Sequence, residues 1–164
     1  MRKIGLLSDT HGFFDDRLIH HFKDCNEIWH AGDIGNIDTM FKITSFKPVI
    51  AVYGNIDGHD IRAEYPKHQR FLCEKVDVWM THIGGYPNKY DVSVRDKIRK
   101  HPPNLFITGH SHVLKVMYDK KLDLLHINPG SAGKYGFHNV RTAIRFIIDN
   151  EKITNLEVIE LGKR

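Results

Sequence analysis

Residues 2–12, RKIGLLSDTHG, place an apolar run directly before a polar turn that carries Asp9 and His11. The run 2–7 is typical of a buried β-strand. In open α/β sheets, ligand sites gather just beyond the carboxyl ends of the strands. The opening stretch therefore predicts an α/β protein whose first strand delivers an acid and an imidazole to a site.

The same arrangement recurs along the chain, because four more polar segments each follow a strand-like apolar run. They are Gly32-Asp33, Gly54-Asn55-Ile56-Asp57, Thr81-His82 and Gly109-His110-Ser111-His112. Loops that are far apart in sequence can converge at one edge of a sheet. We therefore expect their side chains to form one cluster.

Hydrophobic periodicity predicts the elements between these segments. Helices are expected over 15–24, 37–46 and 91–101. Strands are expected over 2–7, 26–30, 48–53, 69–74, 76–81, 104–108, 113–119, 121–127, 140–149 and 151–160. A parallel βαβαβ half followed by an antiparallel half indicates an α/β fold of two packed mixed β-sheets flanked by helices, an αββα sandwich.

Length and composition favour one domain over residues 1–164, because the chain has no linker, no repeat and no low-complexity tract. No run reaches the ~18–20 apolar residues of a membrane span, and no secretory signal pattern opens the chain, so we expect a cytoplasmic protein with no membrane partner. Its net charge of +4 is spread along the chain without interleaved aromatic residues. This pattern disfavours a nucleic-acid partner.

Seven potential metal ligands stand in the five polar segments. Residues two apart on an extended chain point the same way, so Asp9 and His11, and likewise His110 and His112, can each face one point. The full set is Asp9, His11, Asp33, Asn55, His82, His110 and His112. Such a mixture of oxygen and nitrogen ligands suits transition metals rather than Ca²⁺. Two ions ~3.5–4 Å apart would use all seven if Asp33 bridges them.

Each of these residues also has a purely structural interpretation. Asp9 and Asp33 could be turn formers or helix caps, Asn55 could supply a turn residue, and His82 could be a core histidine. Turn formation does not require histidine at two separate strand ends, however. The combined pattern therefore favours a metal site.

The ordered series D-x-H, G-D, G-N-x-D, H and G-H-S-H resembles the calcineurin-like metallophosphoesterases. The chain length and Asn128-Pro129-Gly130-Ser131 resemble their small single-domain phosphodiesterase branch. The resemblance implies that Asp9, His11, Asp33 and His112 hold one divalent ion, and that Asp33, Asn55, His82 and His110 hold the other. Mn²⁺ is the first expectation, and Fe, Zn, Ni or Co are the alternatives.

The activity implied is hydrolysis of a small phosphodiester or nucleotide-type substrate by in-line attack of a metal-bridging hydroxide. Asp9, Asp33, Asn55 and His82 would act through that hydroxide. Many relatives place a general-acid histidine where this chain has Ile56, and His59 is a candidate replacement. His30 and Asp57 are candidates for supporting the ligands, while Arg141 and Lys134 are candidates for gripping phosphate.

A rival interpretation is a non-catalytic metal-binding scaffold or protein-interaction module of the same fold, since the retromer scaffold subunit resembles this family too. All seven ligand positions are intact here, which favours an enzyme. A metal-dependent hydrolase or oxygenase of another class is a further alternative, although a facial triad would leave four ligands unexplained. Exposed strand edges leave a homo-oligomer open.

Overall fold

A computed structural model describes residues 1–164, and its framework is two five-stranded sheets. The first sheet has the order β12-β11-β1-β2-β3. Its strands are β1 (Arg2–Leu7), β2 (Glu27–His30), β3 (Val49–Ala51), β11 (Val140–Asp149) and β12 (Lys152–Lys163). Strands β1, β2 and β3 are parallel, and β11 pairs antiparallel with β1 on their other side.

The second sheet has the order β4-β5-β8-β10-β9. Its strands are β4 (His68–Cys73), β5 (Val76–Thr81), β8 (Leu105–Ile107), β9 (Leu114–Asp119) and β10 (Leu124–Pro129). The inner strands β5, β8 and β10 are parallel, whereas the edge strands β4 and β9 are antiparallel to their neighbours. A small hairpin of β6 (Gly85–Tyr86) and β7 (Lys89–Tyr90) lies outside this sheet.

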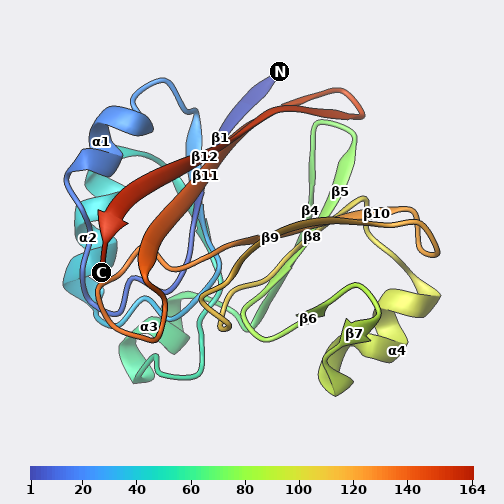
Figure 1. Ribbon diagram of the computed structural model, residues 1–164, viewed down its shortest axis with the longest axis horizontal. Helices are drawn as coiled ribbons and strands as arrows, with labels where there is room; N and C mark the ends of the chain where they lie inside the picture. Colours follow the sequence, from blue (N-terminus) through green and yellow to red (C-terminus); the bar gives the residue numbers. More distant parts are fainter.

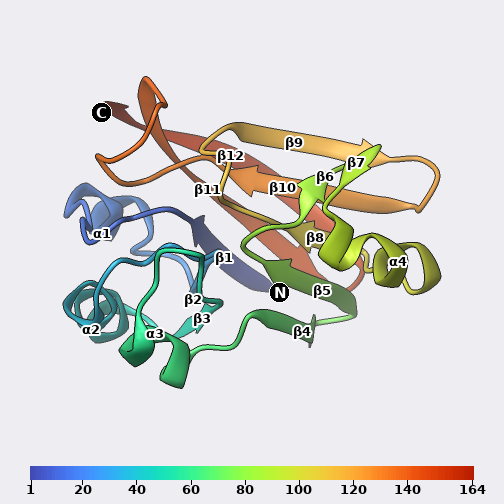
Figure 2. The ribbon, with the colours of Figure 1, turned by 90° about the horizontal axis from the view of Figure 1, so that it is seen from below.

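Helices cover the outer faces of both sheets. They are α1 (Arg17–His21), α2 (Ile37–Phe46), α3 (His59–Glu64) and α4 (Val92–Lys100). The first three lie beside the first sheet, while α4 lies beside the second sheet at the opposite end of the molecule (Figures 1 and 2). None of these helices combines the length and the apolar character needed to cross a bilayer.

Three apolar clusters hold the layers together. Between the sheets, fully buried side chains such as Leu6, Trp29 and Ile107 form one continuous core. Phe22 belongs to the cluster under α1 and α2, and Ile98 to the one under α4. Burial of such side chains removes roughly 1.5–3 kcal/mol of unfavourable hydration each, so the sheets form a rigid platform. The predicted fold class, two packed mixed sheets flanked by helices, is confirmed.

The structure differs from the predicted elements at several ends. The helix predicted over 15–24 extends only over Arg17–His21, because Phe22 turns away from helical geometry at its C-cap. The sequence analysis missed α3 and the β6–β7 hairpin, which are too short to produce a periodic pattern. Helix 37–46 was predicted correctly, and Asn36 caps it by accepting a hydrogen bond from the Thr39 amide.

All five polar segments leave the carboxyl ends of parallel strands. They follow β1, β2 and β3 of the first sheet, and β5 and β8 of the second. Because the two sheets pack face to face, these strand ends meet at one edge of the sandwich (Figure 2). The topology therefore delivers the predicted ligands to one place.

A buried ion pair ties the start of α1 to the last strand. Arg141 Nη1 donates to Asp15 Oδ2 at 2.7 Å, and its other nitrogens donate to the Leu161 and Lys163 carbonyls. Only 4% of Arg141 is exposed. Its guanidinium is fully engaged, so the prediction that Arg141 grips phosphate is wrong.

We expect Asp15→Asn to destabilise the fold by about 3 kcal/mol at pH 7, because Arg141 would keep a buried charge without its counter-charge. The Arg17 guanidinium, opposed by burial and assisted by Arg141, holds the pKa of Asp15 well below its usual value. The stabilisation is therefore complete above the unfolded-state pKa of about 4 and decreases as pH falls below it. Denaturant unfolding of both proteins at pH 7 and pH 3 measures this.

Glu151→Gln serves as the matched control, because its ion pair with Lys75 is exposed and 3.8 Å long. Its effect should stay within about 0.5 kcal/mol. An Asp15→Asn protein as stable as the wild type at pH 7 would contradict the role of the buried pair.

Candidate metal centre

Six of the seven predicted ligands form two adjacent groups at the shared edge of the sheets. Within each group, one ligand atom from every residue lies within 4.8 Å of the others. The first group is Asp9, His11 and His112, and the second is Asp33, His82 and His110. Each group combines residues from distant parts of the sequence, as the sandwich topology requires.

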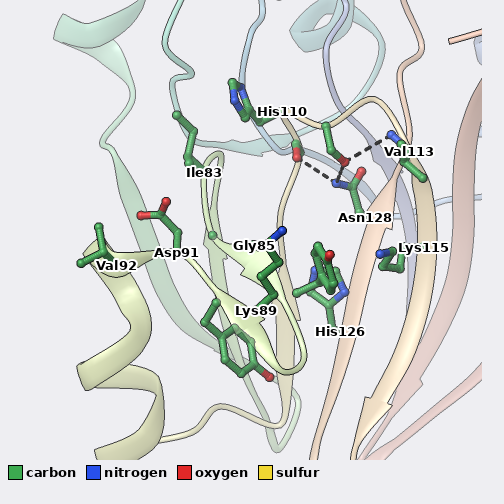
Figure 3. A pocket seen from close by; sticks show the side chains of 15 residues that line it. Ile83, Gly85, Lys89, Asp91, Val92, His110, Val113, Lys115, His126 and Asn128 are labelled. Atoms are coloured by element: carbon green, nitrogen blue, oxygen red, sulfur yellow. Dashed lines mark hydrogen bonds between the residues drawn. The ribbon is translucent and has the colours of Figure 1, made fainter. Parts of the chain in front are cut away.

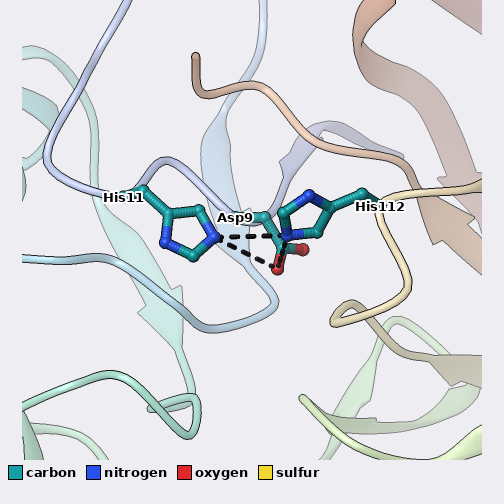
Figure 4. A group of neighbouring side chains, drawn as sticks. All are labelled: Asp9, His11 and His112. Atoms are coloured by element: carbon teal, nitrogen blue, oxygen red, sulfur yellow. Dashed lines mark hydrogen bonds and ion pairs between the residues drawn. The ribbon is translucent and has the colours of Figure 1, made fainter. Parts of the chain in front are cut away.

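The first group is compact (Figure 4). His112 Nε2 lies 3.1 Å from Asp9 Oδ1, and His11 Nε2 lies 3.2 Å from His112 Nε2. His11 Nε2 is also 3.9 Å from Asp9 Oδ1. Two imidazole nitrogens and one carboxylate oxygen thus face a common point, which is the donor arrangement of a transition-metal site.

Asp33 lies between the two groups. Its Oδ2 is 3.2 Å from His82 Nε2 in the second group and 3.8 Å from His11 Nε2 in the first. Its Oδ1 accepts a hydrogen bond from the Ile56 amide at 3.1 Å. One carboxylate oxygen therefore remains available to both groups, as a bridging ligand requires.

The tautomer of His82 is determined by a backbone carbonyl. His82 Nδ1 lies 2.7 Å from the Ala31 carbonyl oxygen, which can only accept, so the Nδ1 carries a proton. A neutral His82 then directs the lone pair of Nε2 toward the Asp33 and Asp9 carboxylates. Burial lowers the pKa of His82, but these carboxylates outweigh it and raise the pKa above its usual value. Either a proton or a metal cation at Nε2 relieves the repulsion.

The same argument determines the tautomer of His112. His138 Nε2 lies 3.0 Å from the Gly133 carbonyl oxygen and must donate to it, so a neutral His138 Nδ1 can only accept. His112 Nδ1 lies 3.3 Å from that acceptor and donates to it. His112 Nε2 therefore presents a lone pair toward Asp9 Oδ1. Such outer contacts orient ligating imidazoles in metalloproteins.

Two polar atoms at this point are buried without any hydrogen-bond partner. They are Asp9 Oδ1 and His82 Nε2. The other oxygen of Asp9 accepts from the Ser8 hydroxyl at 2.5 Å and from the His110 amide at 3.2 Å. A buried unpaired polar atom costs about 1–3 kcal/mol. A cation between these atoms would satisfy both, so the residues present fit a metal site.

The backbone at the site is strained. Five of the candidate ligands have positive φ angles between 47° and 67°: Asp9, His11, Asp33, His110 and His112. The left-handed region costs a residue with a side chain roughly 1 kcal/mol or more, and residues of this kind concentrate at functional sites. Position 54 has no room for a side chain, because a Cβ on Gly54 would lie 2.0 Å from Asp33 Oδ1.

Buried hydrogen bonds hold the strained loops in place. The Asp57 carboxylate accepts from the amides of Ile34, Gly35 and Gly54 and so joins the loops after β2 and β3. His30 Nε2 donates to Thr10 Oγ1, which donates to the Ile34 carbonyl. Asp57 and His30 contact the loops rather than the ligand imidazoles that the sequence analysis considered as their partners.

The remaining predicted residues have different positions. Asn55 is exposed and lines a cavity of about 380 Å³ together with His82. Ile56 is 46% exposed beside it, where its amide contacts Asp33. His59 stands at the exposed start of α3 and lines neither this cavity nor the larger one beside His110. Lys134 places its Nζ over the Phe13 ring.

Sequence analysis missed three residues that contact the site. Ser8 and His138 bond to ligands, and the Tyr135 ring lies 5.3 Å from the His11 ring. The unusual number of histidines is the one sequence signal that pointed toward His138. Nothing in its neighbourhood distinguished it from a surface histidine.

The family model for the calcineurin-like phosphoesterase superfamily domain matches residues 2–151. A curated relative from Methanothermobacter thermautotrophicus, described as a probable metallophosphoesterase, is 29% identical and aligns with 97% of this chain and 92% of its own length.

Solved structures share the fold. An archaeal protein described as a novel phosphodiesterase has a TM-score of 0.74 at 23% identity, covering 97% of this chain and 99% of its own. Vps29 from Entamoeba histolytica, solved in complex with Zn²⁺, has a TM-score of 0.76 at 15% identity, covering 96% and 98%. At these identities the likeness shows the fold alone.

We expect Mn²⁺ or Zn²⁺ to raise the melting temperature of the chelator-treated protein, because a cation satisfies Asp9 Oδ1 and His82 Nε2. At about 100 times Kd the gain is ~2.7 kcal/mol, or roughly 5–10 °C. Asp33→Asn should remove most of this shift, whereas Asp96→Asn, on the exposed face of α4, should retain it. Differential scanning calorimetry measures both. Equal shifts in the two variants would place the metal elsewhere.

Proposed function

The chain belongs to the calcineurin-like phosphoesterase superfamily, and on that premise we propose that it is a phosphodiesterase that depends on two divalent metal ions. One ion would be held by Asp9, His11, Asp33 and His112, and the other by Asp33, Asn55, His82 and His110. The observation that carries the proposal is the pair of imidazoles, His82 and His112, whose Nε2 lone pairs face buried carboxylates.

When bound, the ions supply an activated water and Lewis-acid stabilisation of the phosphoryl oxygens. The chain's own residues prepare this chemistry. Asp33 would provide the shared carboxylate, and the Ala31 carbonyl and His138 hold the Nδ1 protons of His82 and His112, so that the neutral rings present Nε2 lone pairs for metal binding. No protein nucleophile is required, because a water can attack the phosphorus in line with the leaving alcohol.

A non-catalytic metal-binding scaffold or protein-interaction module is the second candidate. The edge strand β9 exposes a row of apolar side chains, Leu114, Val116 and Tyr118, which a partner protein could cover. Metal loading without turnover of any phosphoester would favour this candidate. The preference for Mn²⁺, the cytoplasmic location and a homo-oligomer stay predictions.

We expect the chain to hydrolyse bis(p-nitrophenyl) phosphate faster than p-nitrophenyl phosphate when Mn²⁺, Ni²⁺ or Zn²⁺ is added. Asp33→Ala and Asn55→Ala should each lower kcat by about 100-fold or more, because they remove a metal ligand. Release of p-nitrophenolate measures the rate, and Asp96→Ala is the matched control. Equal rates in the wild type and both ligand variants would falsify the site.

Ile56→His should raise turnover of diesters with poor leaving groups. The side chain at position 56 is partly exposed beside Asp33, so an imidazole there can protonate a departing alkoxide, an effect typically worth 10²–10⁴-fold. The test compares the hydrolysis rates of two diesters that share one ester group and differ only in the leaving group, which is p-nitrophenolate in one and an alkoxide in the other. The gain should be confined to the alkyl ester, and an unchanged alkyl rate would argue against a missing general acid.

A further inference from the structure

A cavity of about 680 Å³ opens beside His110, the most exposed of the candidate ligands in the second group. The β6–β7 hairpin and the start of α4 form one side, and β9 and β10 form the other (Figure 3). Its volume lies in the range of pockets that bind small molecules. A substrate bound at the metal centre would extend into it past His110.

Positively charged side chains outnumber negatively charged ones in the lining of this cavity. Lys89 and Lys115 project from opposite sides, and Lys115 Nζ lies 3.5 Å from the centroid of the Tyr86 ring. A cation–π contact of this kind holds the ammonium group in place. Asp91 is the one carboxylate in the lining, and it already accepts from the amide and hydroxyl of Ser93 at the start of α4. With two ammonium groups and one carboxylate, the lining carries a net positive charge.

The floor of the cavity contains a buried imidazole with an unused nitrogen. His126 is 1% exposed, its Nε2 lies 2.9 Å from Thr108 Oγ1, and its Nδ1 has no partner. Burial, followed by the charge of Lys115, lowers the pKa of His126 to about 4, so the ring is neutral at pH 7. The Thr108 hydroxyl donates its one proton to the Gly85 carbonyl, so Nε2 of the neutral ring donates to Thr108 and Nδ1 is left as an unpaired acceptor that adds no donor to the cavity.

The other polar groups nearby are satisfied. Asn128 donates to Gly109 and Ser111, and its oxygen accepts from the Gly130 amide. In the 380 Å³ cavity beside Asn55, Arg62 is already bonded to the Asp57 and Asn55 carbonyls. The larger cavity sets two ammonium groups against one carboxylate. Two ammonium groups match the double negative charge of a phosphate monoester.

We propose that the 680 Å³ cavity binds a second phosphate group of the substrate, with Lys89 and Lys115 as its partners. This inference rests on the proposed function, in which the leaving alcohol departs beside position 56. The retained alcohol then extends past His110 and carries the second phosphate. The substrate class is a phosphodiester with an additional phosphomonoester on its retained half, such as a nucleoside bisphosphate ester.

Two substrates that differ only in this group test the proposal. They are the 5′-p-nitrophenyl ester of thymidine 5′-monophosphate and the same ester with a 3′-phosphate. We expect kcat/KM to be at least tenfold higher for the second, since the leaving group is identical. Lys89→Met and Lys115→Met should reduce this ratio toward 1, and Lys42→Met, on exposed α2, should preserve it. Equal kcat/KM values in the wild type would overturn the proposal.

Calorimetry on the metal-free protein separates this proposal from the proposed function. Thymidine 3′,5′-bisphosphate should bind at least tenfold more tightly than thymidine 5′-monophosphate, and Lys89→Met, at an exposed position, should remove the difference. Equal affinities would refute the phosphate subsite even if the protein hydrolyses diesters. Tighter binding of the bisphosphate by a protein that hydrolyses no diester would support the subsite and reject the hydrolase.

Discussion

Buried carboxylates and imidazole lone pairs that face each other are the constraint on which the rest of the site depends. Neutral His82 and His112 cannot donate to Asp9 or Asp33, because the Ala31 carbonyl and His138 hold the ring protons on the Nδ1 atoms. The arrangement is unfavourable in isolation and favourable around a metal ion. The fold must therefore hold this arrangement rigidly, and its elements can be understood from that requirement.

Rigidity comes from both halves of the chain. Strand β11 pairs with β1, and the turn after β10 contacts the loop after β1 directly, since the Ala132 and Gly133 amides donate to the Ser8 and Asp9 carbonyls. The Ser131 hydroxyl also donates to the Asp9 carbonyl. These bonds hold Asp9 at its positive φ. The C-terminal strands thus support the site although they supply none of its candidate ligands.

Much of the fold could be predicted from the sequence because the strands alternate with turn residues and helix 37–46 has a strong period. The candidate ligands could be predicted as a cluster because each follows a strand that ends at the same edge. Contacts between side chains that are far apart in the sequence could not be predicted. Arg141 looks like a solvated loop arginine in the sequence, and only the return of β12 beside Asp15 reveals a buried ion pair. His138 has no local pattern that separates it from the other histidines.

The charge of the metal centre gives the positively charged cavity beside it a separate role. With the two dications that we propose, the two carboxylates would leave the centre with a modest positive charge, which would attract one phosphodiester anion but discriminate poorly among diesters. Specificity then requires contacts away from the reacting phosphorus. Lys115, held by Tyr86, stands at such a distance, on strand β9 of the second sheet, which carries no candidate ligand. Substrate selection and hydrolysis would therefore depend on different strands of the same rigid sandwich.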